Sequence, residues 1–127
     1  MKEAYRNTIK DGREIYIPNW PVDVALENLT KVGRVFGTSA VIKIAELNVA
    51  SGVVAVMECV EPNIAAAMIK HFVCQVRIDG SKITPDTINT MFSGDLHAVI
   101  ELFTHVLHSQ YSDFFDSGLA KDSSQEQ

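Results

Sequence analysis

The sequence lacks the clustered positive charge that marks nucleic-acid-binding proteins. Its 127 residues hold 11 Lys and Arg against 16 Asp and Glu, a formal net charge of −5, and the basic residues form no run. Proteins that bind DNA or RNA need clustered Lys and Arg to replace the counterions of the phosphates. The composition therefore argues against a nucleic-acid partner and suits a soluble protein or one with a basic protein partner.

Cysteine and long apolar runs are also scarce. The two cysteines, Cys59 and Cys74, form no CxxC pair, so we expect two buried free thiols rather than a zinc knuckle, and nothing requires a disulfide. Charged and amide side chains interrupt the most apolar stretch, residues 41–60, which argues against a membrane span. The N-terminal residues show no apolar core of a signal peptide. These features predict a cytoplasmic protein without a membrane partner.

Catalytic signatures are missing as well. No serine lies in a GxSxG elbow, and the seven glycines form neither a phosphate-binding loop nor a dinucleotide fingerprint. Asp11 and Asp79 each precede a glycine, a position where Asp is favoured for conformational reasons in turns. We therefore predict a protein with no catalytic residues, no bound metal and no cofactor.

What the sequence does contain is a repeated local plan of strand, Asp-Gly turn, short strand, proline and helix. The first copy begins at Thr8 and includes Asp11-Gly12; the second spans 73–83 and includes Asp79-Gly80. Asp-Gly between β-prone runs indicates a hairpin, because glycine accepts a positive φ at little cost. Shared turn chemistry explains the likeness of the two copies as easily as a duplication does.

Helical periodicity dominates the rest of the chain. Apolar residues at three- and four-residue spacing predict a helix that starts at Pro21 and ends at Gly37. Residues 49–60 fit either a buried helix or a buried strand, and we favour the helix. Further helices are expected, and these cover 38–47, 64–72, 84–94 and 95–116, with Gly118 as the last stop.

The predicted fold is α+β and predominantly helical. A small N-terminal β-hairpin is followed by a helical bundle, with a second short hairpin near 73–83. Length and apolar content favour a single globular domain, which we place at 1–118. The polar residues 119–127 are expected to form a disordered tail.

The last predicted helix carries a stripe of His97, Glu101, His105 and His108. Steps of three and four residues place all four on one face, and such a set can bind zinc or iron. The apolar stripe of the same helix is centred on the opposite side. We therefore expect the His/Glu stripe to face solvent, with Glu101 and His105 as a local pair. A metal-dependent enzyme built on these four residues is the alternative.

Four aromatic residues are the candidates for partner binding: Trp20, Tyr111, Phe114 and Phe115. Trp20 lies between a strand and a helix, where it either closes one end of the core or anchors a partner. The cluster from Tyr111 to Phe115 is richer in aromatics than one helix face needs. Phe115 falls on the histidine side and is the best candidate for an exposed contact, although the cluster equally fits the end of a core.

Three stretches of the chain resemble the small tail assembly chaperones of long-tailed bacteriophages: DGREIYIPNWPVDVALENL, IKHFVCQVRIDGSKITPDTINTMFSGDL and HVLHSQYSDFF. The resemblance implies a mainly helical protein of the host cytoplasm that acts during tail morphogenesis and is absent from the mature virion. It implies binding to the long helical tape measure protein, with the tail tube protein and self-association as further contacts. A minor structural protein of the virion is the rival interpretation.

Overall fold

The computed structural model of the chain describes residues 3–125. These residues form an α+β fold that is predominantly helical, which confirms the predicted class. The elements, in chain order, are β1 Tyr5–Thr8, β2 Glu14–Ile17, α1 Val22–Phe36, α2 Thr38–Ala45, α3 Val49–Glu58, α4 Pro62–Val73, β3 Arg77–Ile78, β4 Ser81–Lys82, α5 Pro85–Met91 and α6 Leu96–Gln125.

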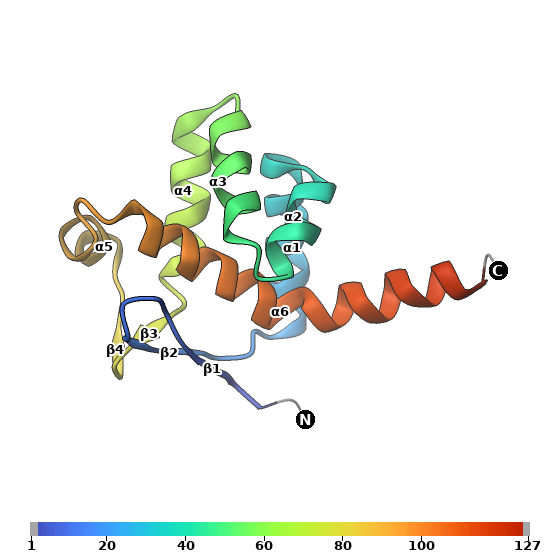
Figure 1. The fold of residues 1–127 in the computed structure, drawn as a ribbon, viewed down its shortest axis with the longest axis horizontal. Helices are drawn as coiled ribbons and strands as arrows, with labels where there is room; N and C mark the ends of the chain where they lie inside the picture. Colours follow the sequence, from blue (N-terminus) through green and yellow to red (C-terminus); the bar gives the residue numbers. More distant parts are fainter. Residues whose placement is uncertain (1–2, 126–127) are drawn as a thin grey trace.

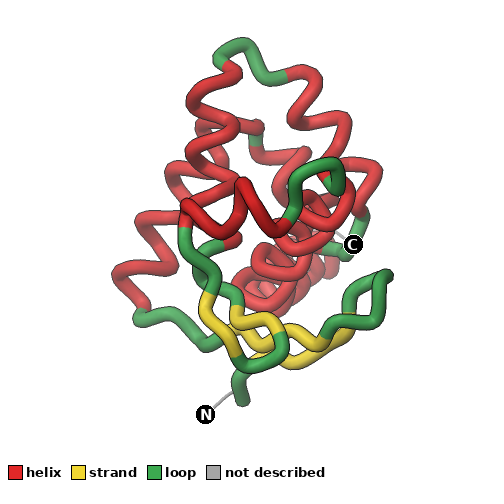
Figure 2. Tube along the Cα trace, turned by 90° about the vertical axis from the view of Figure 1, so that its left-hand side faces the viewer, coloured by secondary structure: helices red, strands yellow, loops and turns green. Residues whose placement is uncertain are grey.

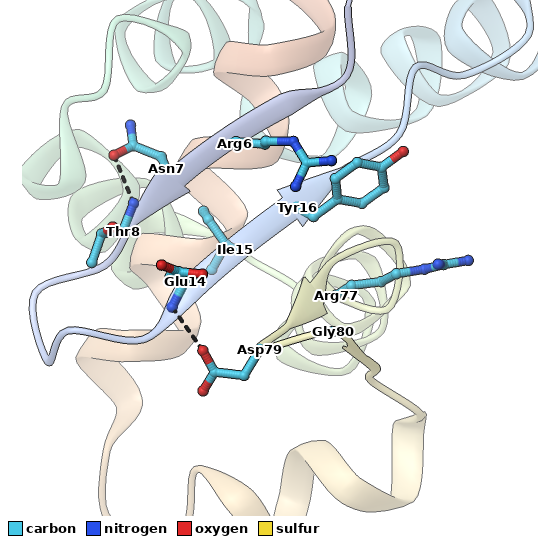
Figure 3. Close-up of a pocket in the computed structure, with 9 residues that line it drawn as sticks. All are labelled: Arg6, Asn7, Thr8, Glu14, Ile15, Tyr16, Arg77, Asp79 and Gly80. Atoms are coloured by element: carbon cyan, nitrogen blue, oxygen red, sulfur yellow. Dashed lines mark hydrogen bonds between the residues drawn. The ribbon is translucent and has the colours of Figure 1, made fainter.

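Both expected hairpins are present, and they join into one antiparallel sheet of order β1-β2-β3-β4. The junction is the pairing of β2 with β3, which places Ile15 opposite Ile78. At the end of this pair, the Asp79 N–H donates to the Glu14 carbonyl (2.9 Å). The Glu14 N–H in turn donates to Asp79 Oδ1 (3.1 Å), as Figure 3 shows. The two segments with a shared plan thus lie side by side in space.

The same dipeptide makes two different turns. Asp79 and Gly80 both have positive φ (49° and 85°) and form a two-residue loop of the kind that suits a tight hairpin. In the first hairpin only Gly12 has a positive φ, 94°, and the loop is one residue longer. Asp11 there accepts hydrogen bonds from Arg13, and this contact lowers the pKa of the Asp11 carboxyl.

Helix α6 lies in the middle of the molecule, between the sheet and the other helices (Figures 1 and 2). Helices α2, α3 and α4 pack against it from one side, and β1 lies along the other. As a result every residue from 102 to 107 is buried. The bundle core therefore surrounds α6 instead of contacting one face of it.

Residues 49–60, where helix and strand were both open, contain the helix α3, as favoured. Its Gly52 is buried against α6: a Cβ at this position would lie 3.0 Å from Ile100 Cγ2. Small residues in this segment thus allow two helices to approach closely.

Helix α6 continues past Gly118 to Gln125, so the predicted end near Asp116 is wrong. A single glycine is only a modest break in a helix. Figure 1 shows this last part of α6 projecting away from the other elements. The division into a globular domain, 1–118, and a polar tail, 119–127, stays a prediction.

Cys59 and Cys74 are both free, as expected, but each is partly exposed rather than fully buried. Partial burial raises the pKa of the Cys74 thiol. Among the helices described for residues 3–125, none has the length and apolar character needed to cross a membrane.

Candidate partner-binding site

The His/Glu stripe of α6 does not face solvent, and that prediction is wrong. His105 is only 7% exposed, and the side chain of Glu101 is 13% exposed. Glu101 Oε2 accepts a hydrogen bond from the Lys10 N–H (2.9 Å), which ties the loop of the first hairpin to α6. Only His97, at the start of the stripe, has a largely exposed side chain. The stripe is the surface on which β1 and its loop pack.

His105 holds β1 through a short chain of hydrogen bonds. Asn7 Nδ2 donates to Tyr5 Oη (2.7 Å), and Tyr5 Oη lies 2.8 Å from His105 Nδ1. Either group can donate in this pair, and a neutral imidazole with a free Nδ1 lone pair accepts the Tyr5 O–H. Burial, helped by the nearby His108, lowers the pKa of His105 and keeps the ring neutral.

His108, on the same face of α6, contacts both β1 and α2: its ring packs edge-to-face on Tyr5 (5.6 Å between centroids). Its Nδ1 lies 2.8 Å from the carbonyl oxygen of Ala45, the last residue of α2. A carbonyl can only accept, so Nδ1 carries the proton and satisfies a helix-end carbonyl that has no partner within α2. Within residues 3–118, whose side chains the structure describes, no three His, Cys, Asp or Glu side chains are grouped to hold a metal ion. Glu101, His105 and His108 thus have structural partners.

A groove of about 360 Å³ lies between the start of α1 and the second half of α6. Three of the four aromatic candidates line it, together with apolar residues of α1 whose spacing predicted this helix. The lining residues are Asn19, Trp20, Val22, Ala25, Leu26, Leu29, Ser109, Gln110, Tyr111 and Phe114. The groove therefore unites residues that are 90 positions apart in the sequence.

Trp20 forms part of the groove and also joins three elements. Its ring packs edge-to-face on Phe72 of α4 (5.4 Å between centroids) and on Tyr111 of α6 (6.2 Å). Its backbone N–H donates to Gln110 Oε1 (3.2 Å), and Gln110 Nε2 donates to the Pro18 carbonyl (2.8 Å). The sequence left open whether Trp20 closes one end of the core or anchors a partner, and these contacts are of the first kind.

Tyr111 and Phe114 occupy different depths of the groove. Tyr111 is 3% exposed, and its O–H donates to the Ala25 carbonyl (2.8 Å) on α1. Burial raises the pKa of this phenol. Phe114 is 59% exposed and stands at the rim. Tyr111 therefore builds the wall of the groove, and the Phe114 ring is exposed at its rim.

Phe115 lies outside the groove. It is half-buried, packs against the core, and lines a separate hollow beside His108 on the α2 side. The sequence placed Phe115 on the histidine side and left open whether it is exposed or closes the end of the core. In the structure it is half-buried, because the histidine side of α6 is covered, and Phe114 is the more exposed ring.

Sequence reasoning missed two residues at the mouth of the groove. Val22 and Leu26 continue the apolar stripe of α1, yet they are 76% and 56% exposed. The apolar spacing of α1 already starts in its first turn, which does not pack on the core. Periodicity alone therefore gave no sign that the side chains of this turn are exposed. An extra valine on another face of this turn, Val24, is also exposed and is the one signal that the turn is not simply amphipathic.

Comparison with known protein families gives one match. A family described as phage tail assembly chaperone protein (TAC) matches residues 11–121. No curated protein and no solved structure matches the chain. The family match contains all of the groove and runs from the turn of the first hairpin into the projecting end of α6. The chain therefore belongs to the phage tail assembly chaperone family.

Proposed function

We propose that the protein binds the tape measure protein through the groove between α1 and α6 and thereby assists assembly of the tail tube. One observation carries the proposal: Val22, Leu26 and Phe114, all more than half exposed, surround a single apolar groove. Apolar surface that stays in water costs free energy, and a partner that covers it recovers that energy. The family membership supports a tail protein as this partner.

The shape of the groove favours an amphipathic helix as the segment that binds. Val22 and Leu26 are one helical turn apart on α1 and present neighbouring side chains. An apolar helix face with anchors at i, i+3 or i+4 can insert between them and the Phe114 ring. A long helical protein such as the tape measure protein supplies such faces repeatedly.

The fixed walls of the groove favour binding without rearrangement. The rings of Trp20 and Tyr111 pack on each other, the Trp20 backbone N–H donates to Gln110 Oε1, and the Tyr111 O–H donates to the Ala25 carbonyl. Aromatic side chains that are fixed before binding lose little conformational entropy on contact. In this proposal Trp20 and Tyr111 shape the site and Phe114 contacts the partner. A contact through Phe115 stays a prediction, at the neighbouring hollow.

The remaining parts of the proposal follow the family. The protein acts in the host cytoplasm without catalysis, recruits the tail tube protein and leaves before the virion is complete. Reversible apolar contact suits such a transient role, because a groove of this size supports far less buried area than a permanent interface. A metal-dependent enzyme finds less support, since the residues that suggested it have structural partners.

Co-expression with the tape measure protein tests the groove. Leu26→Asp and Phe114→Asp each place a charge where the apolar face of the partner would lie, which disfavours burial. We expect each to reduce the amount of tape measure protein that co-purifies at least tenfold. Met57→Asp is the matched control, because Met57 is 79% exposed on α3 and lies outside the groove. It should co-purify like the parent.

Thermal melting of each variant shows whether the fold is kept, which is expected since all three side chains are exposed. Groove variants that fold and still bind would refute the groove as the site. A parent protein that neither binds the tape measure protein nor raises its solubility would refute the proposed partner.

Purified virions test the transient role. Mass spectrometry of mature particles should detect tape measure and tail tube proteins and no peptide of this chain. Its presence at a fixed stoichiometry would favour the rival interpretation, a minor structural protein.

A further inference from the structure

The outward face of the sheet carries a row of three cations and one tyrosine. The strand register places Arg6 opposite Tyr16, Tyr16 opposite Arg77, and Arg77 opposite Lys82. Successive residues of a strand point to opposite faces. Because Ile15, Ile17, Ile78 and Ile83 are buried, their neighbours in the row all point away from the core.

The row is organised rather than a chance gathering of flexible side chains. The guanidinium carbon of Arg6 lies 4.8 Å from the centroid of the Tyr16 ring, and that of Arg77 lies 5.9 Å from it. Figure 3 shows the three side chains beside one another. A guanidinium that rests on an aromatic ring keeps its N–H edge free for a carboxylate. The Tyr16 ring thus positions two donors in advance.

Three members of the row, Arg6, Tyr16 and Arg77, line an open hollow of about 610 Å³ that also contains two carboxylates, Glu14 and Asp79. These lie at the turn end of the strands (Figure 3), and Asp79 Oδ1 is engaged by the Glu14 N–H. Neither carboxylate has an ion pair with Arg6, Arg77 or Lys82 among the described residues. Three cations therefore stand together on a chain whose net charge is −5.

We propose that this row, defined as Arg6, Tyr16, Arg77 and Lys82, binds an extended acidic segment of a partner protein. The row crosses four strands and so spans about 14 Å, three interstrand spacings. Three acidic side chains at alternate positions of an extended chain span about 13 Å and point to the same side. The charges are opposite and the total lengths match, and the row is separate from the apolar groove.

A protein segment fits the row better than a single-stranded nucleic acid. Nucleic acids need aromatic faces on which bases can stack, and here both arginines lie over the ring of Tyr16. A long polyanion would also meet the negative charge of the rest of the chain. A short acidic segment avoids both problems.

Fluorescence anisotropy with a labelled peptide, Ser-Glu-Thr-Glu-Thr-Glu-Ser, tests the proposal at about 50 mM salt, where charge contacts are weakly screened. The full-length chain should bind this peptide at least tenfold more tightly than its counterpart with Gln for each Glu. The double variant Arg6→Gln/Arg77→Gln should lose at least tenfold in affinity. Arg34→Gln, which removes an exposed charge from the last turn of α1, should change affinity less than twofold.

NMR of the parent protein gives a readout that does not depend on a variant's folding. Addition of the peptide should shift the arginine Nε–Hε signals of Arg6 and Arg77 more than that of Arg34. Equal binding of the Glu and Gln peptides, or signals of the row that do not move, would overturn the proposal. Tighter binding of an eight-nucleotide oligothymidylate would also overturn it and would assign the row to nucleic acid.

Discussion

His105 fastens the first hairpin to α6 from a buried position. The imidazole is 7% exposed, lies 2.8 Å from Tyr5 Oη, and has the titratable His108 nearby on α6. Its folded-state pKa lies below the ordinary 6.5, so below pH 6.5 the unfolded chain binds a proton that the folded chain does not. One side chain thus links stability to pH.

The pH dependence of unfolding tests this link. The contribution of His105 to the free energy of unfolding is fully present above pH 6.5. It declines as the pH falls below that value, by at most about 1.4 kcal/mol per pH unit. We expect the free energy of unfolding, measured in urea between pH 7.5 and 5, to fall less steeply with falling pH for His105→Gln than for the parent. His97→Gln is the control, because the His97 side chain is exposed, and it should keep the slope of the parent. A parental slope in His105→Gln would contradict the assignment.

At the scale of elements, α6 explains most of what the sequence could and could not predict. Asp-Gly pairs and helix caps act locally, so both hairpins and the α5 start at Thr84 were predictable. An amphipathic pattern assumes one covered face, whereas β1 and α2 also cover the histidine side of α6. His105 was therefore assigned to solvent, although Tyr5, 100 positions away in the sequence, contacts it. The groove needed the same non-local information, because its two walls come from α1 and α6.

Two glycines give a matched test of the packing of α3 on α6. An added Cβ at Gly33 of α1 meets nothing within 4 Å, whereas at Gly52 it meets Ile100 at 3.0 Å. Gly33→Ala should raise the free energy of unfolding by about 0.5–1 kcal/mol through helix propensity. Gly52→Val should lower it by about 1–3 kcal/mol, because α6 is held on both sides and cannot move away.

Urea unfolding measures both changes. If Gly52→Val were as stable as the parent, α3 could not pack as closely on α6 as the structure shows. If Gly33→Ala gave no gain, the helix-propensity argument for an open site would fail instead.

At the scale of the whole molecule, Trp20 connects the sheet to the bundle. It follows β2 and packs on α4 and α6, and its backbone N–H donates a hydrogen bond to Gln110 Oε1. The sheet with its cationic row and the groove with its apolar rim are thus adjoining parts of one body, and both depend on this joint.

Trp20→Ala tests the joint. Removal of the half-buried indole should lower the free energy of unfolding by about 2–4 kcal/mol, near the lower range for buried aromatic truncations. Phe114→Ala, at the exposed rim, should change it by less than about 0.5 kcal/mol. Chemical unfolding monitored by circular dichroism compares the two. A Trp20→Ala protein that is fully stable but does not bind the tape measure protein would make Trp20 a partner anchor.

The central place of α6 also has a consequence for synthesis. A ribosome makes α1 to α5 before α6, so the helices and the sheet emerge before the helix that they surround. Until α6 follows, their buried faces have no common core, and the pairing of β2 with β3 must close a loop that contains four helices. Local hairpins and helices form within microseconds, whereas such long-range closure is slower. The domain therefore gains its stability only when α6 reaches the centre.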